Sequence, residues 1–252
     1  MKLLTLARDL QRRKARERHQ RFVAEGVRTV EALLDSAVQM VGLLATNELG
    51  RDERGAALLV KAARRGIPLQ EVSARELDDA ADTDTPQGIL AVAEIPQRVM
   101  DTPPEVGRFL VLDALQDPGN VGTVIRTAAA LGVATTLALP GTVDLWNAKV
   151  VRSSMGALFS HSALPATWES VTAWLDTHAV PLWAADTNGA PLDTITVAPD
   201  RLALAVSNEG AGLSAPVAER ARQRVAIRMS PGVESLNVAV ATGILLHALR
   251  PR

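Results

Sequence analysis

The sequence predicts an α/β protein built on a mostly parallel sheet, with helices on both faces. Short apolar runs typical of buried strands alternate with segments of helical periodicity along the chain. Such alternation is typical of parallel sheets that are covered on both sides. Hydrophobic residues make up 47% of the 252 residues and charged residues 22%, so the chain can bury a sizeable core.

The first half reads as a small α/β unit. Val27, Val30, Leu33 and Leu34 recur at helical spacing, and a second helical segment ends at Gly66. Apolar runs between the helical segments indicate buried strands. The elements expected here are helices over 2–18, 27–36, 54–66 and 73–80, and strands over 41–46, 67–73 and 88–95.

A segment with three prolines and no periodicity, 96–107, is the best linker candidate. We therefore expect a first domain over 1–98, a linker over 99–107 and a second domain over 108–252.

The second half restarts with a fully apolar strand core, FLVL. Strands are expected over 108–115, 134–140, 180–186, 201–207 and 224–229, and helices over 123–132, 144–158, 168–178, 214–223 and 235–250. In sheets of this kind, ligands bind at the carboxyl ends of the strands.

Composition excludes several classes of site. The chain has no cysteine, which removes disulfides, thiol nucleophiles and cysteine metal sites. Its four histidines are scattered without an HExxH-type pair, so no metal is expected. No apolar run reaches about 18 residues, and the basic start lacks the apolar stretch of a secretory signal. The expected location is the cytoplasm.

Charge is unevenly distributed although the net charge is −1. Eight basic residues lie between Arg8 and Arg28, against three acidic ones. Such a run fits a solvated helix face, and it also fits a surface that contacts phosphates. The candidate phosphate contacts are Arg12, Arg13, Lys14 and Arg16.

Three glycine- and asparagine-rich segments, 117–128, 207–214 and 229–243, each follow an expected strand. Their shared position at the ligand side of a parallel sheet predicts a single composite site. In the second segment Gly210, Gly212 and Ala215 fit a dinucleotide-binding fingerprint. The acid that would bind a ribose is missing, because the next strand ends at Met229, and this weakens the hypothesis of a nicotinamide-dependent oxidoreductase.

Four side chains in the outer segments draw attention. Asn120 and Ser235 each precede an expected helix and are natural N-caps. Arg126 lies in an otherwise apolar helix, where it either pairs with a carboxylate or faces an anion. Asn237 falls within the first turn of the last helix, a poor position for an asparagine, so we expect it to have a partner.

In this order and spacing, the three segments resemble the signature motifs of the SpoU (TrmH) family of RNA ribose 2′-O-methyltransferases, within the SPOUT superfamily. The resemblance covers residues 108–250 and extends to KVVRSSMGALF at 149–159. The first hundred residues resemble the family's accessory RNA-binding domain through RFVAEGVRTVEALL and TPQGILAV.

The resemblance implies S-adenosylmethionine as cofactor, a C-terminal trefoil knot and a homodimer. It implies methylation of a ribose in structured RNA, with 23S ribosomal RNA favoured and tRNA as the other candidate. A non-catalytic RNA-binding protein with the same fold is the remaining alternative, which the retained motif side chains disfavour.

Matching residue by residue, the resemblance implies two sets. Asn120 and Arg126 would line the target ribose, and Arg126 matches the residue assigned to the 2′-hydroxyl. The implied catalytic set is Arg126, Asn120, Glu209, Ser235 and Asn237. The implied cofactor-binding set is Ser207, Asn208, Gly210, Gly212, Ile227, Met229, Ser235, Leu236 and Asn237.

Two positions depart from the family pattern. Ser207 stands where many relatives have glycine, and Arg228 stands where proline is common. A guanidinium is essentially never deprotonated in proteins. We therefore expect Arg126 to stabilise a developing alkoxide and hold a neighbouring phosphate rather than act as a base.

Overall fold

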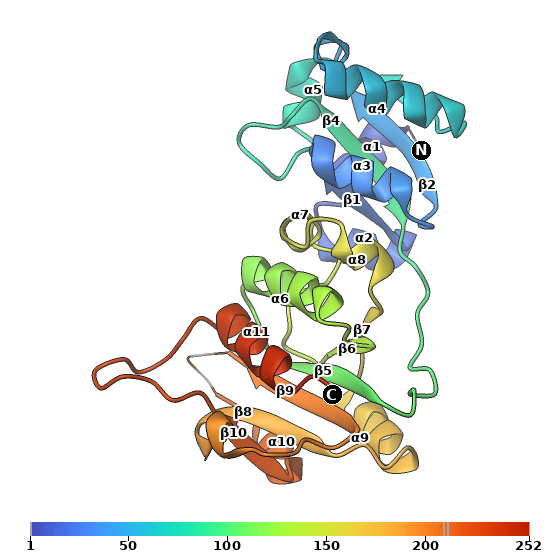
Figure 1. The fold of residues 1–252 in the computed structure, drawn as a ribbon. Coiled ribbons are helices and arrows are strands. Elements are labelled where there is room, and N and C mark those ends of the chain that lie inside the picture. Colours follow the sequence, from blue (N-terminus) through green and yellow to red (C-terminus); the bar gives the residue numbers. More distant parts are fainter. Residues whose placement is uncertain (1, 209, 211, 252) are drawn as a thin grey trace. The chain divides into compact units, whose positions relative to one another are not determined.

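The computed structural model describes residues 2–208, 210 and 212–251. The chain divides into two compact units, the first formed by residues 1–97 and 146–160, the second by 98–145 and 161–252 (Figure 1). Each is described by itself. No helix among the described residues is long and apolar enough to cross a membrane.

The first unit has a four-stranded sheet in the order β1-β4-β2-β3. β4 runs antiparallel to β1 and β2, and β3 is parallel to β2. The strands are β1 (Arg21–Glu25), β2 (Met40–Ala45), β3 (Leu69–Glu71) and β4 (Ile89–Glu94). The helices are α1 (Leu3–Asp9), α2 (Arg13–His19), α3 (Val27–Asp35), η1 (Leu49–Arg51), α4 (Glu53–Arg64), α5 (Ala74–Asp78), α7 (Ala148–Ser153) and α8 (Ala157–Ser160).

The prediction of a single helix over 2–18 is wrong, because the helix is interrupted between α1 and α2. Arg12 is extended there, with φ −91° and ψ 132°. Arg16, only 4% exposed, donates from Nη1 to the carbonyls of Leu10 at 2.7 Å and Gln11 at 2.9 Å. The carbonyls left open by the end of α1 are thus satisfied by a buried guanidinium.

The segment Trp146–Ser160 packs with the first unit, although the sequence-based boundaries place it in the second domain. Phe22 of β1 lies against Trp146, with ring centroids 4.5 Å apart, and against Phe159 at 5.9 Å. A single helix over 144–158 is also incorrect. Met155 and Gly156, with φ +51° and +88°, separate α7 from α8.

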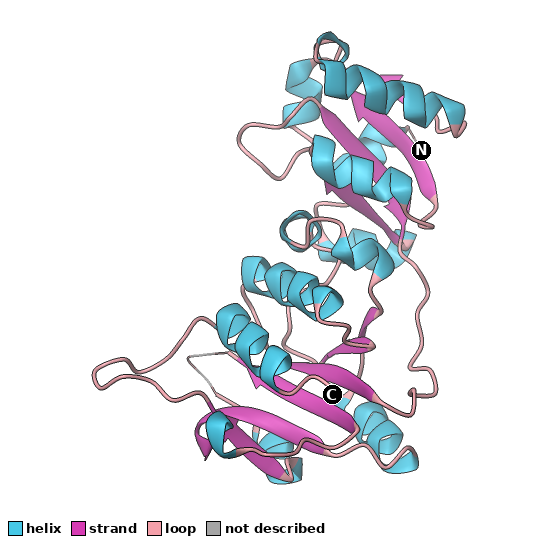
Figure 2. Cartoon of the chain, viewed as in Figure 1, coloured by secondary structure: helices cyan, strands magenta, loops and turns pink. Residues whose placement is uncertain are grey.

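The second unit has a six-stranded, parallel sheet in the order β10-β8-β9-β5-β6-β7. Figure 2 shows α6 and α11 on one face and α9 and α10 on the other, so the predicted fold class is confirmed. The strands are β5 (Gly107–Asp113), β6 (Thr135–Ala138), β7 (Ala163–Pro165), β8 (Leu182–Pro191), β9 (Arg201–Ser207) and β10 (Gln223–Ala226). The helices are α6 (Pro118–Ala130), α9 (Trp168–Thr177), η2 (Leu192–Thr194), α10 (Ala215–Arg220) and α11 (Val238–Ala248).

Successive side chains of β5 point to opposite faces of the sheet, so this strand contributes to the core on both faces. Phe109 and Val111 pack with Trp174 of α9 and Val217 of α10 in one apolar cluster. The intervening Leu110 and Leu112 point to the opposite face, as successive side chains of a strand must. This continuous burial explains why β5 reads as an unbroken apolar run.

Candidate active site

The start of α6 differs from the sequence prediction. Asp117, not Asn120, is the N-cap: its Oδ1 accepts from the backbone N–H of Asn120 at 2.7 Å, and Pro118 opens the helix. The Asp-Pro pair is itself a strong N-terminal pattern, because proline lacks the N–H that would otherwise need an acceptor. Asn120 lies inside the first turn, and its side chain is therefore not used as a cap.

Helix α11 also begins later than expected. Asn237, not Ser235, is the N-cap, and its Oδ1 accepts from the backbone N–H of Ala239 at 3.0 Å and of Val240 at 3.4 Å. Its Nδ2 donates to Oδ1 of Asn120 at 2.9 Å. The expected partner of Asn237 is thus found, and it is the asparagine of the first segment, 117 residues away in the chain.

Arg126 lies on the same helix as Asn120, two turns further along. Its side chain is exposed, and among the described residues it makes no hydrogen bond or ion pair. Of the two interpretations of this arginine, pairing with a carboxylate finds no support within this part of the chain. An unpaired guanidinium on a helix beside a polar pair is suited to bind an anion from solution.

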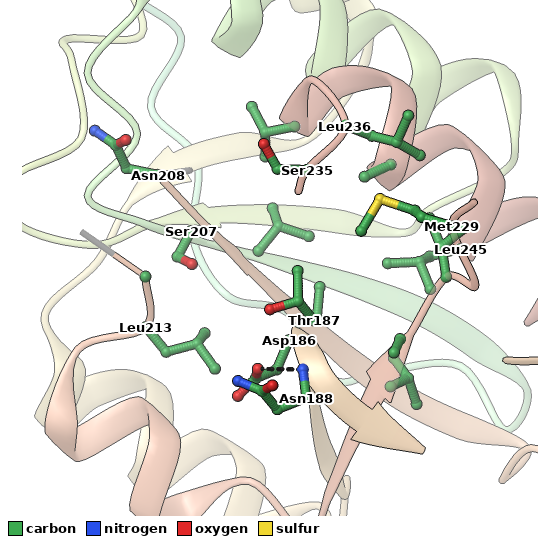
Figure 3. Close-up of a pocket in the computed structure, with 18 residues that line it drawn as sticks. Asp186, Thr187, Asn188, Ser207, Asn208, Leu213, Met229, Ser235, Leu236 and Leu245 are labelled. Atoms are coloured by element: carbon green, nitrogen blue, oxygen red, sulfur yellow. Dashed lines mark hydrogen bonds between the residues drawn. The ribbon is translucent and has the colours of Figure 1, made fainter. Parts of the chain in front are cut away.

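A cavity of about 320 Å³ opens next to this pair, between residues 185–188 of β8, the loops that follow β9 and β10, and the first turns of α11 (Figure 3). Val238, Ala241 and Leu245 of α11 form part of an apolar wall. Polar groups come from Asp186 and Asn188 of β8 and from Ser207 and Asn208 at the end of β9. A mostly apolar lining with a few polar groups is typical of sites for small organic ligands.

Most of the predicted cofactor-binding residues come together around this cavity. Its lining includes Ser207, Asn208, Gly212, Ile227, Met229, Ser235 and Leu236. Gly210 and Asn237 are not part of the lining: Gly210 falls between the lining residues Asn208 and Gly212, and Asn237 between Leu236 and Val238. Glu209 lies outside the described residues.

Residues 185–188, in the middle of β8 where its pairing with β10 is irregular, line the cavity and were missed from the sequence. Asp186 Oδ1 accepts from the N–H of Asn188 at 2.9 Å, and its Oδ2 pairs with Arg224 Nη1 at 3.1 Å. The pattern Asp-Thr-Asn-Gly at the end of an expected strand could have revealed these residues, because it is the same turn chemistry as in the other three segments.

The two departures from the family pattern have different surroundings. The Ser207 side chain lies at the cavity (Figure 3), where a glycine would leave more space for a ligand. Arg228 points away to Asp193 of η2, with Nε and Oδ2 3.0 Å apart and both side chains largely exposed. This ion pair joins the loops that follow β8 and β10.

The predicted RNA contacts of the basic segment are largely engaged within the first unit. Arg12 pairs with Asp9, and Arg13 with Glu17 at 2.8 Å. Lys14 is exposed, whereas Arg16 is the buried guanidinium described above. Arg16 therefore stabilises the turn between α1 and α2, and we assign it no contact with RNA.

No group of three or more His, Asp or Glu side chains within the described residues could hold a metal ion.

Comparison with known proteins settles the family. The SpoU rRNA Methylase family matches residues 107–247, and an MRM3-like substrate binding domain matches residues 5–91. The chain belongs to the SpoU rRNA methylase family. The family predicted from the three motifs is thereby confirmed.

Individual SpoU proteins agree. The chain is 34% identical over 247 residues to the 23S rRNA (guanosine(2553)-2′-O)-methyltransferase RlmP of Bacillus subtilis, covering 96% of this chain and 94% of that protein. An AdoMet-bound rRNA methyltransferase structure from Sinorhizobium meliloti is 29% identical with a TM-score of 0.83, covering 98% of this chain and 93% of that one. The SpoU methyltransferase AviRb of Streptomyces viridochromogenes, in complex with AdoMet, is 25% identical with a TM-score of 0.84, covering 97% and 95%. None of these supports a nicotinamide-dependent enzyme or a non-catalytic protein.

Proposed function

We propose that the chain transfers a methyl group from S-adenosylmethionine to the 2′-hydroxyl of a ribose in 23S ribosomal RNA. The observation that carries the proposal is the meeting of the three segments: Asn237 of the third binds Asn120 of the first, beside a cavity lined by the second and third. The B. subtilis relative, which matches nearly the whole chain, supports the same reaction and RNA.

The residues around the cavity fit S-adenosylmethionine. This cofactor has an apolar purine and polar ribose and amino-acid ends, so it needs a lining of mixed character. The apolar wall of α11 suits the purine, while Asp186, Asn188 and Asn208 can receive the polar ends. When bound, the cofactor supplies a methyl group on a positively charged sulfur, which is a good leaving group.

The chain's own residues then position the ribose. Asn237 uses its oxygen to cap α11 and its nitrogen to bind Asn120 Oδ1. The Nδ2 group of Asn120 is what this pair leaves to donate to an oxygen of the substrate. Alignment of the 2′-oxygen with the methyl group can contribute about 7–11 kcal/mol to catalysis.

Arg126 acts by charge. Its guanidinium stabilises negative charge that develops on the 2′-oxygen and binds the adjacent phosphate. Because no carboxylate among the described residues occupies it, this charge is available to the substrate. The supporting role of Glu209 stays a prediction from the family pattern.

Transfer of labelled methyl groups from S-adenosylmethionine to purified 23S ribosomal RNA tests the proposal. A 2′-O-methyl group blocks alkaline cleavage at that nucleotide, because the 2′-oxygen is the internal nucleophile. We therefore expect label that survives in one alkali-resistant dinucleotide. Label on a base, or no transfer to this RNA, would contradict the proposal.

We also propose that the second unit carries the trefoil knot and pairs with a second copy in the cytoplasm. Val240 and Ile244 on α11 are 53% and 40% exposed, a large apolar area for a free helix face. Light scattering should give twice the mass of one chain, and Ile244→Glu should shift the protein toward monomer. A wild-type chain that is monomeric at micromolar concentration would contradict the dimer.

A further inference from the structure

The middle of β8 leaves the sheet beside the cavity that we assign to S-adenosylmethionine. The pairing of β8 with β9 stops at Ala184. Its pairing with β10 skips from Ala184 to Ala190, although the two partner residues on β10 are consecutive. Residues 185–189 therefore lie outside both ladders. Irregular pairing of this kind re-aims side chains and is frequent beside active sites.

Gly189 makes this irregularity possible. A Cβ atom at this residue would lie 2.5 Å from the backbone carbonyl carbon of Arg224 and 2.6 Å from the backbone nitrogen of Val225. Both contacts are with backbone atoms, so a side chain would fit only if β10 moved. The close approach of Gly189 to β10 holds residues 185–188 at the cavity, where they form part of its lining.

Asp186 is the only titratable side chain among the described residues that line the cavity. Its side chain is 17% exposed. Oδ1 accepts from the N–H of Asn188 at 2.9 Å, and Oδ2 pairs with Nη1 of Arg224 at 3.1 Å. Because a carboxylate oxygen has two lone pairs, each of these oxygens can accept one further hydrogen bond. The carboxylate is thus held in place and still has acceptor sites for a ligand.

The Asp186 side chain lies away from the reacting end of the cavity. Figure 3 shows Asp186 across the cavity from Ser235 and Leu236. Leu236 directly precedes Asn237, which binds Asn120 where the target ribose of the RNA is expected. The methyl group of the cofactor must face that pair of asparagines. A part of the cofactor that is remote from the methyl group therefore meets Asp186.

Two polar parts of the cofactor can meet a carboxylate, namely its own ribose and its amino-acid end. The amino-acid end carries a carboxylate that Asp186 would repel, and no basic side chain among the described lining residues offsets this repulsion. The ribose is neutral, and its two adjacent hydroxyls can both donate to one carboxylate. We propose that Asp186 binds the 2′- and 3′-hydroxyls of the cofactor's ribose, an inference that rests on the proposed function.

This role explains where the chain places a ribose-binding acid. In dinucleotide-binding folds, such an acid ends the strand that follows the glycine-rich loop. In this chain the corresponding strand is β10, which leads to Met229 without an acid. The neighbouring strand β8 brings Asp186 to the same cavity instead.

Calorimetry on the full chain with three adenosyl compounds tests the inference. S-adenosylhomocysteine has the ribose hydroxyls and the amino-acid end, 5′-methylthioadenosine has only the hydroxyls, and 2′,3′-dideoxy-5′-methylthioadenosine has neither. Asp186→Ala should weaken binding of the first two about tenfold or more, as expected for hydrogen bonds to a charged group, and leave binding of the third unchanged. Asp186→Asn keeps the side-chain shape and one acceptor oxygen, so it should show the same pattern with a smaller loss. Asp176→Ala, at an aspartate that pairs with Arg220 outside the cavity, is the matched control and should bind all three compounds like the wild type.

The pattern of losses separates the alternatives. If Asp186→Ala weakens binding of S-adenosylhomocysteine but not of 5′-methylthioadenosine, the carboxylate binds the amino-acid end and the inference is overturned. An equal loss with the dideoxy compound would mean that the substitution only disturbs the irregular part of β8, which also overturns it. The titrations contain no RNA, so a failure to methylate 23S ribosomal RNA would overturn the proposed function and leave the role of Asp186 standing.

Discussion

Two sets of arginines look equally cationic in the sequence and are treated very differently by the fold. In the first set, the guanidinium of Arg16 is buried and donates to carbonyls, and that of Arg12 forms an ion pair with Asp9. In the second set, Arg28 and Arg126 have no such partner among the described residues. Because a ligand must compete with existing partners, charge density along the chain locates a binding surface less well than the absence of internal partners does.

The largest expected effect is on Arg126. Arg126→Ala should lower methyl transfer at least about a hundredfold, as is typical when a donor that stabilises transition-state charge is lost. Arg126→Lys keeps the charge but not the planar fork, so it should also be badly impaired. Initial rates with labelled S-adenosylmethionine provide the measurement, and Arg222→Ala, another exposed arginine of the second unit, is the control. Near-normal turnover of Arg126→Ala would break the comparison.

Arg108 is an arginine of the second unit that, like those of the first set, already has partners within the chain. Its buried side chain donates to the carbonyls of Leu249, Gly107 and Asp200, and burial lowers its pKa from the usual value. Arg108→Met should lower the free energy of unfolding by about 3 kcal/mol, because three buried carbonyls lose a charged donor. Thermal unfolding measures the change. Arg201→Met, at a more accessible arginine that also binds carbonyls, should cost clearly less.

The pH dependence of stability provides a further test, through a buried histidine that lies near an arginine. Burial and the nearby Arg98 lower the pKa of His161 to about 4, and its ring shares a 2.8 Å hydrogen bond with Thr136. Below pH 6.5, His161 therefore takes up a proton in the unfolded chain but not in the folded chain. The free energy of unfolding is highest above pH 6.5 and decreases as the pH falls toward 4. Between pH 6.5 and 5 we expect a loss of roughly 2 kcal/mol.

Denaturant unfolding at both pH values measures this loss. His161→Gln should flatten the pH dependence, whereas His247→Gln, at an exposed histidine, should leave it as in the wild type. Equal slopes for wild type and His161→Gln would contradict the assignment to His161.

A smaller effect is expected from the basic segment itself. Replacing Arg12, Arg13 and Lys14 together by glutamine should weaken RNA binding less than threefold, because two of the three charges already have carboxylate partners. Filter binding at low salt measures the change. A loss much larger than threefold would show that the basic segment is a main phosphate surface of the chain.

The smallest effect is expected at Arg228. Its pair with Asp193 is largely exposed, and such pairs contribute little. Arg228→Pro, which restores the common family residue, should change the affinity for S-adenosylhomocysteine less than twofold at moderate salt. Calorimetry measures it, and Asp193→Asn should give the same result if only the ion pair matters.

The sequence predicted the strands better than the ends of the helices. Buried strands such as β5 leave an apolar run that periodicity detects directly. Cap residues were misassigned at α6 and α11, because Asp117 and Asn237 are as good caps as Asn120 and Ser235 and only three-dimensional packing decides among them. β1 was missed because its five residues directly follow a charged helix.

The site itself was predicted in outline. The three loops share one edge of the sheet because parallel strands end on the same side, and that follows from the pattern alone. The bond between Asn120 and Asn237 does not, since nothing local fixes a contact across 117 positions. Arg16 shows the converse limit, because its burial depends on a break between α1 and α2 that helix propensity does not predict.

The chain passes between its two units three times, at 97–98, 145–146 and 160–161, because the segment Trp146–Ser160 belongs to the first unit. A single cut in the gene at the proline-rich linker would therefore give two pieces that do not correspond to the two units. The catalytic piece would keep Trp146 and Phe159 without the Phe22 ring that covers them, and the RNA-binding piece would lose Arg152. Recombination that exchanges one RNA-binding module for another must consequently replace two stretches at once, so we expect the two parts of this protein to have been inherited together.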